Sequence, residues 1–342
     1  MRPLTQVRRS ARRQNGFPVP IWTPLAALLL LCGFRFPALV HGQSVPLRTT
    51  RLDMVFSASL FRAANRDDAI AAIRVWASMF ARTHSFPLDP NVAVVDDVAE
   101  LRKRVLAGSA GVLVLEVVEY FQLADLTAVE PVLCALQGEG RVPPRYMLLV
   151  GAGSGISSLE ALRSKSIIIH AITGANLGKV WLDAMFYDGR LGRPEQFFRS
   201  VEIVPKASSA ILPVFFGKAD AAIVNEPSFD VSKEMNPQLG ARLRVLEASL
   251  PLPEGLLCAC RDQLAYREHF LDDMLHLHLD PQGRQISIVL RFSRLAPVEM
   301  SDLARVRELW RKHTLLSRLP EKASLGSLSR QEANPTGKGE EP

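Results

Sequence analysis

The stretch IIIHAITGANLGKVWLDAMF, residues 167–186, decides the fold that we expect for this chain. Its apolar start predicts a buried strand, and the loop that follows holds Thr173, Gly174, Ala175 and Asn176. Apolar residues then recur at helical spacing, at Leu177, Val180, Trp181, Ala184 and Met185. The first N–H groups of a helix have no partner within it, so this junction offers a pocket for an anion or a carbonyl oxygen. The alternative is an ordinary strand-to-helix connection in an α/β domain.

Composition indicates a globular chain of two domains. The 342 residues are 48% hydrophobic and 22% charged, which is enough apolar material for a large core. The net charge of +6 comes from residues 1–42, which hold six arginines and no acid, while the rest carries 35 basic and 35 acidic residues. Because this body is neutral, nucleic-acid binding has no electrostatic support and is not expected.

The first 42 residues are expected to be a secretory signal peptide. Basic residues precede a short apolar segment at 25–33, and Val40 and Gly42 stand at −3 and −1 of a cleavage point before Gln43. An uncleaved anchor is the alternative, and it would also place the body outside the cytoplasm. We therefore expect a periplasmic or otherwise extracytoplasmic protein, with a short N-terminal linker at residues 43–51.

Three cysteines follow the expected cleavage point. An odd number allows at most one internal disulfide in an oxidising compartment. Cys258 and Cys260 lie two apart on one expected strand and are too far apart to bridge comfortably, so Cys134 would pair with one of them. Three buried free thiols are the alternative.

The body alternates strands with helices, which indicates parallel sheets covered by helices on both faces. Asn65 is expected to cap one helix, and Asp96 or Asp97 the next. Strands are expected at 52–56, 92–95, 112–115, 131–136, 146–150, 167–169, 201–204, 220–224 and 256–260. Late helices are expected at 264–277, 285–292 and 301–310, and then a C-terminal tail at 313–342, disordered from about residue 321.

Polar residues follow several of these strands at their carboxyl ends, where open α/β sheets bind ligands. The first and third strands lead to Ser57, Ser59, Phe61, Glu119 and Tyr120. Two later strands lead to Ser208, Ser209, Asn225 and Glu226. We expect these residues to bind a ligand, and the alternative for Phe61 and Tyr120 is a place in the core.

No motif indicates a cofactor or a metal ion. The glycine-rich residues 151–155 resemble a dinucleotide loop, but position 156 is not glycine and His170 stands where an acidic residue would be needed. His276 and His278 are two apart and do not share a helix face. An enzyme is therefore not expected, although an enzyme in which Glu119 or Glu226 acts as a general base is a third hypothesis.

Several phrases together resemble one protein family. They are AVEPVL at 128–133, residues 146–156, SLEAL at 158–162, TGAN at 173–176 and VFFGKADAAI at 214–223. Over about residues 50–312 the chain resembles the phosphate/phosphite/phosphonate group of extracytoplasmic solute-binding proteins, which serve ABC importers. The resemblance implies an α/β, two-lobed type II periplasmic-binding-protein fold with mixed, mainly parallel sheets and an interlobe cleft. One lobe would hold residues 52–145 plus 256–312, and the other residues 146–255.

The resemblance also implies a function. A monomer would close its two lobes on a small ligand, such as a phosphonate- or phosphate-like oxyanion, and deliver it to ABC permease subunits. In the family the loop matching 172–176 is usually rich in serine and threonine, whereas here only Thr173 carries a hydroxyl. Ser208 or Ser209 stands where a histidine is usual, and Asn225 or Glu226 at the final acidic position.

Two alternatives remain open at this point. The carboxylates of Glu116 and Glu119 would repel a doubly charged anion, which favours a cationic, zwitterionic or hydroxyl-rich organic ligand. The same module could also sense a ligand for a membrane-bound signalling partner instead of serving transport.

Overall fold

The computed structural model describes residues 50–61, 65–138, 142–171 and 176–318. The expected signal peptide, nearly all of the expected linker and the segment expected to be disordered lie outside these residues, as do Thr173, Gly174 and Ala175. Within the described part of the chain, no helix has the length and apolar character needed to cross a membrane.

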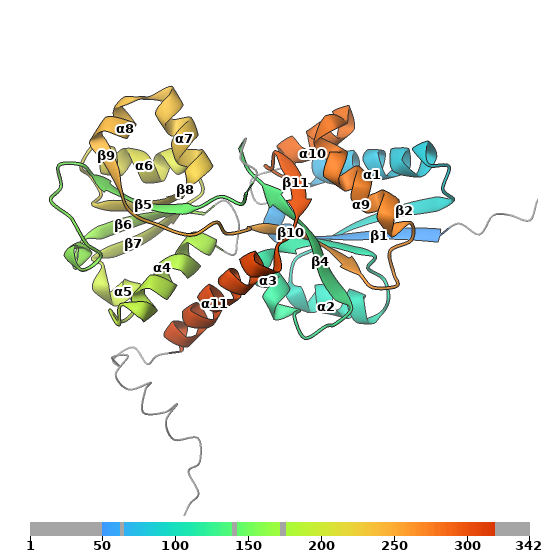
Figure 1. Cartoon of the computed structure of the whole chain (residues 1–342), viewed down its shortest axis with the longest axis horizontal. Coiled ribbons are helices and arrows are strands. Elements are labelled where there is room, and N and C mark those ends of the chain that lie inside the picture. Colours follow the sequence, from blue (N-terminus) through green and yellow to red (C-terminus); the bar gives the residue numbers. More distant parts are fainter. Residues whose placement is uncertain (1–49, 62–64, 139–141, 172–175, 319–342) are drawn as a thin grey trace, which may run out of the picture. The chain divides into compact units, whose positions relative to one another are not determined.

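A six-stranded sheet is built from two separate parts of the chain (Figure 1). Its order is β11-β4-β10-β3-β1-β2. The strands are β1 (Thr50–Ser57), β2 (Leu88–Val95), β3 (Val112–Glu116), β4 (Val129–Leu136), β10 (Gly255–Cys260) and β11 (Arg294–Pro297). β1 to β4 share one direction, and β10 and β11 run against them. The expected return of the strand at 256–260 to this sheet is therefore confirmed.

The second sheet has five strands in the order β7-β6-β8-β5-β9. They are β5 (Tyr146–Gly151), β6 (Ser166–His170), β7 (Ser200–Val204), β8 (Ala221–Asn225) and β9 (Leu243–Ala248). β5 alone runs against the other four. Both sheets are thus mixed, with most strands parallel, as expected. β9 and β11 were not predicted, because these edge strands are mostly exposed or half-buried and lack a regular apolar pattern.

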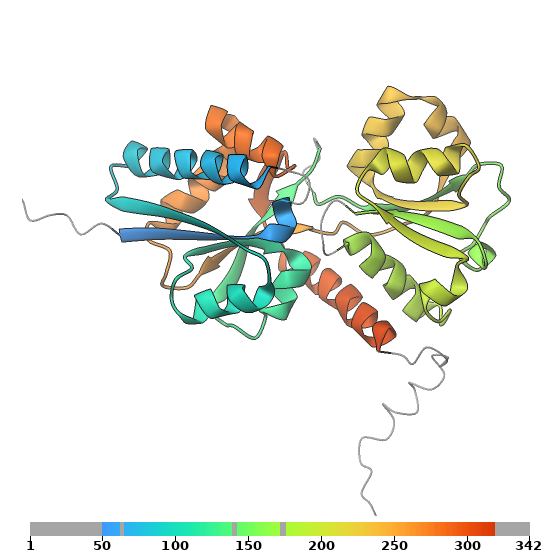
Figure 2. The ribbon, with the colours of Figure 1, turned by 180° about the vertical axis from the view of Figure 1, so that it is seen from behind.

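Helices cover both faces of each sheet (Figures 1 and 2). On the first sheet, α1 (Arg66–Thr83), α9 (Arg267–His276) and α10 (Pro281–Val289) pack on one face, with α2 (Val98–Leu106) and α3 (Val117–Gln122) on the other. On the second, α6 (Ala207–Phe215), α7 (Glu226–Met235) and α8 (Gln238–Arg242) lie opposite α4 (Leu177–Asp188) and α5 (Pro194–Phe197). The short 3-10 helices are η1 (Ala58–Phe61), η2 (Glu160–Leu162) and η3 (Leu277–Leu279).

The expected caps are present where the structure describes them. The side chain of Asn65 accepts from the N–H groups of Asp67 and Asp68, and that of Asp97 accepts from Glu100. These bonds satisfy N–H groups that have no partner inside the helix. The stripe expected on α4 is also buried, apart from the half-buried Met185.

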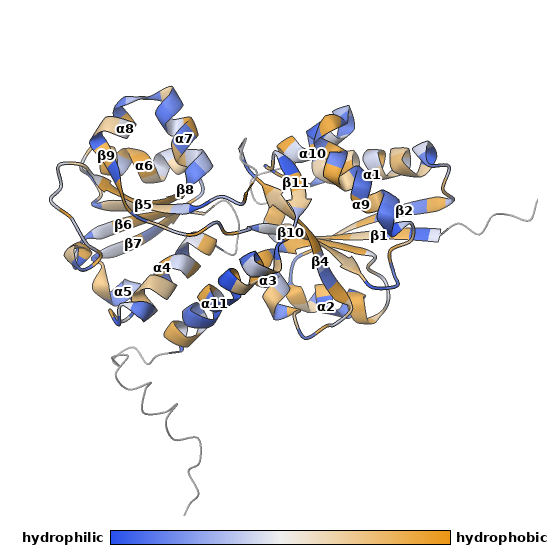
Figure 3. Cartoon of the chain, viewed as in Figure 1, coloured by the Kyte–Doolittle hydropathy of each residue, from blue (hydrophilic) through white to orange (hydrophobic). Residues whose placement is uncertain are grey.

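The last helix differs from expectation. α11 (Met300–Ser317) runs beyond residue 310, so the residues expected to begin a tail at 313 are helical. Its buried side chains, among them Leu303, Val306 and Leu316, join an apolar cluster that extends over both sheets. The helix contacts both α3 and α4, and this packing extends it past the point where the sequence pattern fades. Figure 3 shows the strands mostly in hydrophobic colours and the helices with hydrophilic outer faces.

All three cysteines of the described chain are free and buried. The disulfide between Cys134 and Cys258 or Cys260 is therefore not formed in this structure. The register explains why: β10 places Leu256 opposite Cys134 and puts Cys258 opposite Pro131. Burial raises the pKa of Cys134 and of Cys260 to about 11.

Candidate functional site

Ser57, Ser59 and Glu119 form a hydrogen-bonded cluster on the first sheet. The Ser57 hydroxyl donates to Glu119 Oε1 at 2.6 Å, and the Ser59 hydroxyl donates to Oε2 at 3.2 Å. The two serine oxygens are 2.8 Å apart. Three residues that the sequence placed in the site are therefore brought together.

The strand order explains this cluster. β1 and β3 are parallel neighbours, so Ser57 at the end of β1 lies near Glu116 at the end of β3. α3 starts there, and Glu119 Oε2 also accepts from the Glu116 N–H at 2.9 Å in a capping box. The Glu119 carboxylate thus accepts hydrogen bonds from two hydroxyls and one backbone N–H.

A second polar cluster joins the two sheets. Gln137 follows β4 and Glu254 precedes β10, whereas Tyr146 begins β5 and Asn225 ends β8. The Tyr146 hydroxyl donates to Glu254 Oε1. Gln137 Nε2 donates to Glu254 Oε2 at 2.8 Å, and Asn225 Nδ2 donates to Gln137 Oε1 at 2.9 Å. We call these four residues the hinge cluster, because Gln137 and Glu254 lie in the two segments that connect the sheets.

Tyr146 and Asn225 of the hinge cluster are buried, and Gln137 and Glu254 are half-buried. Desolvation raises the pKa of the Glu254 carboxyl, although the hydrogen bonds that it accepts act in the opposite direction. Burial raises the pKa of Tyr146 well above its ordinary value, and the carboxyl groups of Glu254 and Glu116 raise it further. Tyr146 is therefore a neutral donor at any physiological pH. Only Asn225 of this cluster was predicted, because the connecting segments carry no periodic pattern that singles out Gln137 or Glu254.

The start of α4 lies beside the hinge cluster. A Cβ atom on Gly178 would lie 3.0 Å from Tyr146 Cε1 and 3.1 Å from Ile223 Cγ2, so the helix rests closely on the tyrosine ring. Asn176 caps the helix in a left-handed conformation with φ of 44°, and its Oδ1 accepts from the Lys179 N–H at 3.1 Å. Its Nδ2 is buried and has no partner in the described part of the chain. The described residues thus leave one hydrogen-bond donor unsatisfied at the start of α4.

The positive charge of Arg291 acts on His170, which ends β6 of the second sheet. His170 ends β6 and is 5% exposed, and burial lowers its pKa. The nearby guanidinium of Arg291, which follows α10 of the first sheet, lowers the pKa further. Arg291 was not predicted, since an isolated arginine after a helix carries no recognisable signal.

The remaining candidates lie at the start of α6, at the start of α7 and in the apolar core. Ser208 and Ser209 are exposed on the first turn of α6. Glu226 forms an ion pair with Arg145, with Oε1 2.8 Å from Nη2. Phe61 and Tyr120 are 5% and 7% exposed and belong to apolar clusters, which is the alternative that the sequence left open for them.

The chain has two mixed sheets that are covered by helices and joined by two connecting segments. Polar residues lie at the strand ends. This arrangement defines a type II periplasmic binding protein fold. Residues 65–303 match the family described as ABC transporter, phosphonate, periplasmic substrate-binding protein, and the chain belongs to this family. Members of this family are solute-binding proteins, and the family is periplasmic. A comparison with curated proteins gives no match.

Solved structures share this fold. A Xanthomonas citri protein bound to ATP has 12% identity and a TM-score of 0.57, with 79% of this chain and 98% of that chain covered. The binding protein component of an ABC phosphonate transporter from Pseudomonas aeruginosa has 13% identity and a TM-score of 0.50, with 83% and 95% covered. PhnD1 from Prochlorococcus marinus in complex with methylphosphonate has 12% identity and a TM-score of 0.50, with 78% and 98% covered. At these identities the likeness concerns the fold.

Proposed function

We propose that this protein binds a small organic oxyanion between its two sheets and delivers it to an ABC importer. The observation that carries the proposal is the hinge cluster, because its hydrogen bonds link both sheets beside the start of α4. Closure of the two lobes on a ligand requires contacts that are made only in the closed form. The buried amide of Asn176 and the charge of Arg291 supply donors for an oxyanion on either side of this cluster.

The carboxylates of Glu119 and Glu254 restrict the kind of ligand that can bind. Glu119 and Glu254 would both repel a doubly charged ion, and the donors around Glu119 are already occupied. A ligand that carries a hydroxyl or ammonium group as well as an oxyanion can donate to Glu119 and avoid this repulsion. We therefore favour a phosphonate- or phosphate-like compound with such a donor over inorganic phosphate.

Thermal unfolding with added ligands tests the proposal. We expect 2-aminoethylphosphonate to raise the melting temperature more than methylphosphonate, and methylphosphonate more than phosphate. At a ligand concentration 100 times the Kd, binding stabilises the folded state by about 2.7 kcal/mol. No shift with any of these compounds at millimolar concentration would contradict the oxyanion class.

Two variants locate the ligand. Asn176→Ala and Arg291→Gln should each reduce the ligand-induced shift, because each removes a proposed donor to the oxyanion. Arg261→Gln changes an exposed arginine of the first lobe and is the matched control for charge. Equal shifts in all three variants would remove Asn176 and Arg291 from the site.

Transport and turnover need separate measurements. A binding protein returns its ligand chemically unchanged, so phosphorus NMR of the ligand after long incubation should show only the starting compound. Delivery predicts that uptake by cells with the matching permease and ATPase depends on this protein. Uptake that is unaffected by its deletion would instead favour a sensing role.

A further inference from the structure

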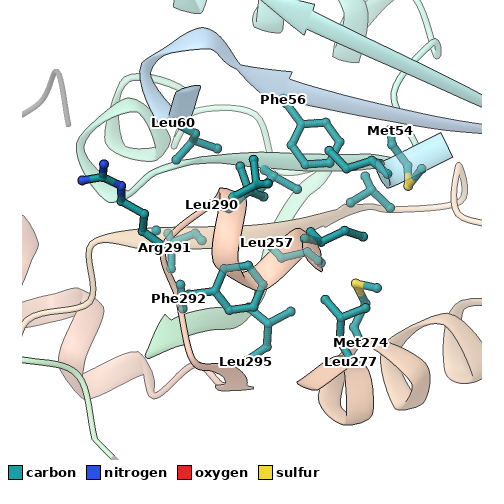
Figure 4. A pocket seen from close by; sticks show the side chains of 18 of the residues that line it. Met54, Phe56, Leu60, Leu257, Met274, Leu277, Leu290, Arg291, Phe292 and Leu295 are labelled. Atoms are coloured by element: carbon teal, nitrogen blue, oxygen red, sulfur yellow. The ribbon is translucent and has the colours of Figure 1, made fainter. Parts of the chain in front are cut away.

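The first lobe contains an apolar cavity of about 110 Å³ next to the hinge cluster. It lies between the first sheet and the helices α1, α9 and α10 (Figure 4). Its walls are aliphatic, aromatic and thioether side chains, among them Met54, Phe56, Trp76, Phe270, Met274 and Leu290. Apolar walls of this kind favour apolar groups over water.

Three of the residues that line the cavity are polar. Gln137 and Glu254 line the cavity and also belong to the hinge cluster. Arg291 is the third polar lining residue, and Figure 4 shows its guanidinium pointing away from apolar side chains such as Phe292 and Leu257. The charge of Arg291 also acts on His170 at the end of β6. Two polar lining residues of the cavity therefore belong to the cluster at which the oxyanion is proposed to bind.

The other polar cluster is linked to the lining of this cavity through neighbouring residues of the chain. Phe56 and Leu60 line it, and each is next in sequence to a serine that binds Glu119, namely Ser57 and Ser59. β1 and η1 thus present apolar side chains to the cavity and hydroxyls to the Glu119 cluster. This arrangement suits a ligand with a polar head and an apolar tail.

We propose that the ligand is an amphipathic oxyanion whose aliphatic or aromatic group occupies this first-lobe cavity while its head lies at the hinge cluster. The inference rests on the proposed function and specifies its substrate class. An apolar cavity of about 150 Å³ binds benzene, so this cavity of about 110 Å³ accommodates about four carbon atoms. An empty cavity destabilises a fold because its lining atoms lose dispersion contacts, and a ligand tail would restore them.

A chain-length series tests the tail. Methyl-, ethyl-, propyl- and butylphosphonate should bind the full chain with affinity that rises about fourfold per added methylene. The gain should level off with hexylphosphonate, once the cavity is full. Equal affinity for methyl- and butylphosphonate would overturn the inference.

A variant with a larger side chain in the cavity tests where the tail of the ligand binds. Val114→Phe adds volume at a half-buried lining position on β3, so this variant should bind methylphosphonate like the wild type and gain nothing from longer chains. Val75→Phe is the control, since it makes the same change on the outer side of α1, where Val75 is 52% exposed. A chain-length gain that survives in Val114→Phe would place the tail elsewhere and overturn the inference.

NMR of methionine methyl groups tests the cavity independently of the head group. Benzene should shift the methyl signals of Met54 and Met274, which line the cavity, and leave those of the exposed Met235 and Met300 in place. Absence of these shifts overturns the inference whatever the phosphonates do. If benzene shifts them but no phosphonate binds, the cavity is supported as an apolar site and the phosphonate head group of the proposed function fails.

Discussion

The imidazole Nδ1 of His313 on α11 lies 2.6 Å from Oδ2 of Asp183 on α4. Asp183 is almost fully buried and also binds Lys179 Nζ at 2.6 Å and 2.8 Å. The C-terminal helix is thereby tied to the second sheet, although the sequence had assigned it to the first lobe. A buried carboxylate that contacts a lysine ammonium group and a histidine ring is strongly coupled to the packing of both helices.

Asp183→Asn should destabilise the protein by about 3–5 kcal/mol, because it leaves Lys179 and His313 without their shared buried charge. Urea unfolding measures the change. Asp188→Asn is the control, since Asp188 is 56% exposed in its side chain and pairs with Lys312 on the surface. That change should cost less than about 1 kcal/mol. Similar small effects for both variants would show that α11 is held by apolar packing alone.

The stability of the protein should fall as the pH rises through the titration of Glu254. Its folded-state pKa is raised above the ordinary value of 4.5, so between these two pKa values the folded state binds more protons than the unfolded state. The free energy of unfolding therefore decreases from pH 4.5 up to the folded-state pKa. In Glu254→Gln this contribution should be absent.

Urea unfolding at a series of pH values checks this prediction through the difference between wild type and Glu254→Gln. Glu247→Gln, an exposed change on β9, controls for the loss of one acidic residue. If the difference between wild type and Glu254→Gln does not vary with pH, the carboxyl of Glu254 is not desolvated in solution.

Gly178→Ala should destabilise the protein and weaken ligand binding. The added Cβ would lie 3.0 Å from the Tyr146 ring, and such overpacking costs about 1–3 kcal/mol. Gly240→Ala on α8 is the control, because its Cβ would make an ordinary contact of 3.5 Å with Lys233 and should stabilise the helix by up to about 1 kcal/mol. Equal stabilisation of both variants would show that α4 does not rest on Tyr146.

The thiols of Cys134, Cys258 and Cys260 should resist alkylation in the folded protein. Burial raises the pKa of Cys134 and of Cys260 to about 11, so little thiolate exists at pH 8, and burial also blocks access. Mass spectrometry after iodoacetamide treatment should find all three modified in urea and none modified without it. Two thiols that stay unmodified in urea until a reductant is added would reveal a disulfide.

Much of the fold was predictable because it is encoded locally. The apolar run of β6 and the helical stripe of α4 follow from periodicity, and the caps Asn65 and Asp97 from side-chain chemistry. Gly217 ends α6 with φ of 69°, a conformation that favours glycine. The cluster of Ser57, Ser59 and Glu119 could also be predicted from the sequence, because parallel neighbouring strands end at the same edge of a sheet.

Only the tertiary structure decided the rest. By itself, the sequence determined the order of strands and helices, the neutral charge of the body and the residues at the strand ends. It did not determine that Tyr146 and Glu254, or Gln137 and Asn225, meet, because these contacts depend on which strands become neighbours. β10 enters the first sheet between β3 and β4, and that placement brings the segment before it to the hinge cluster and to the rim of the cavity. Long-range pairing is a cooperative property of the whole sheet, whereas local patterns report only the few residues that make them.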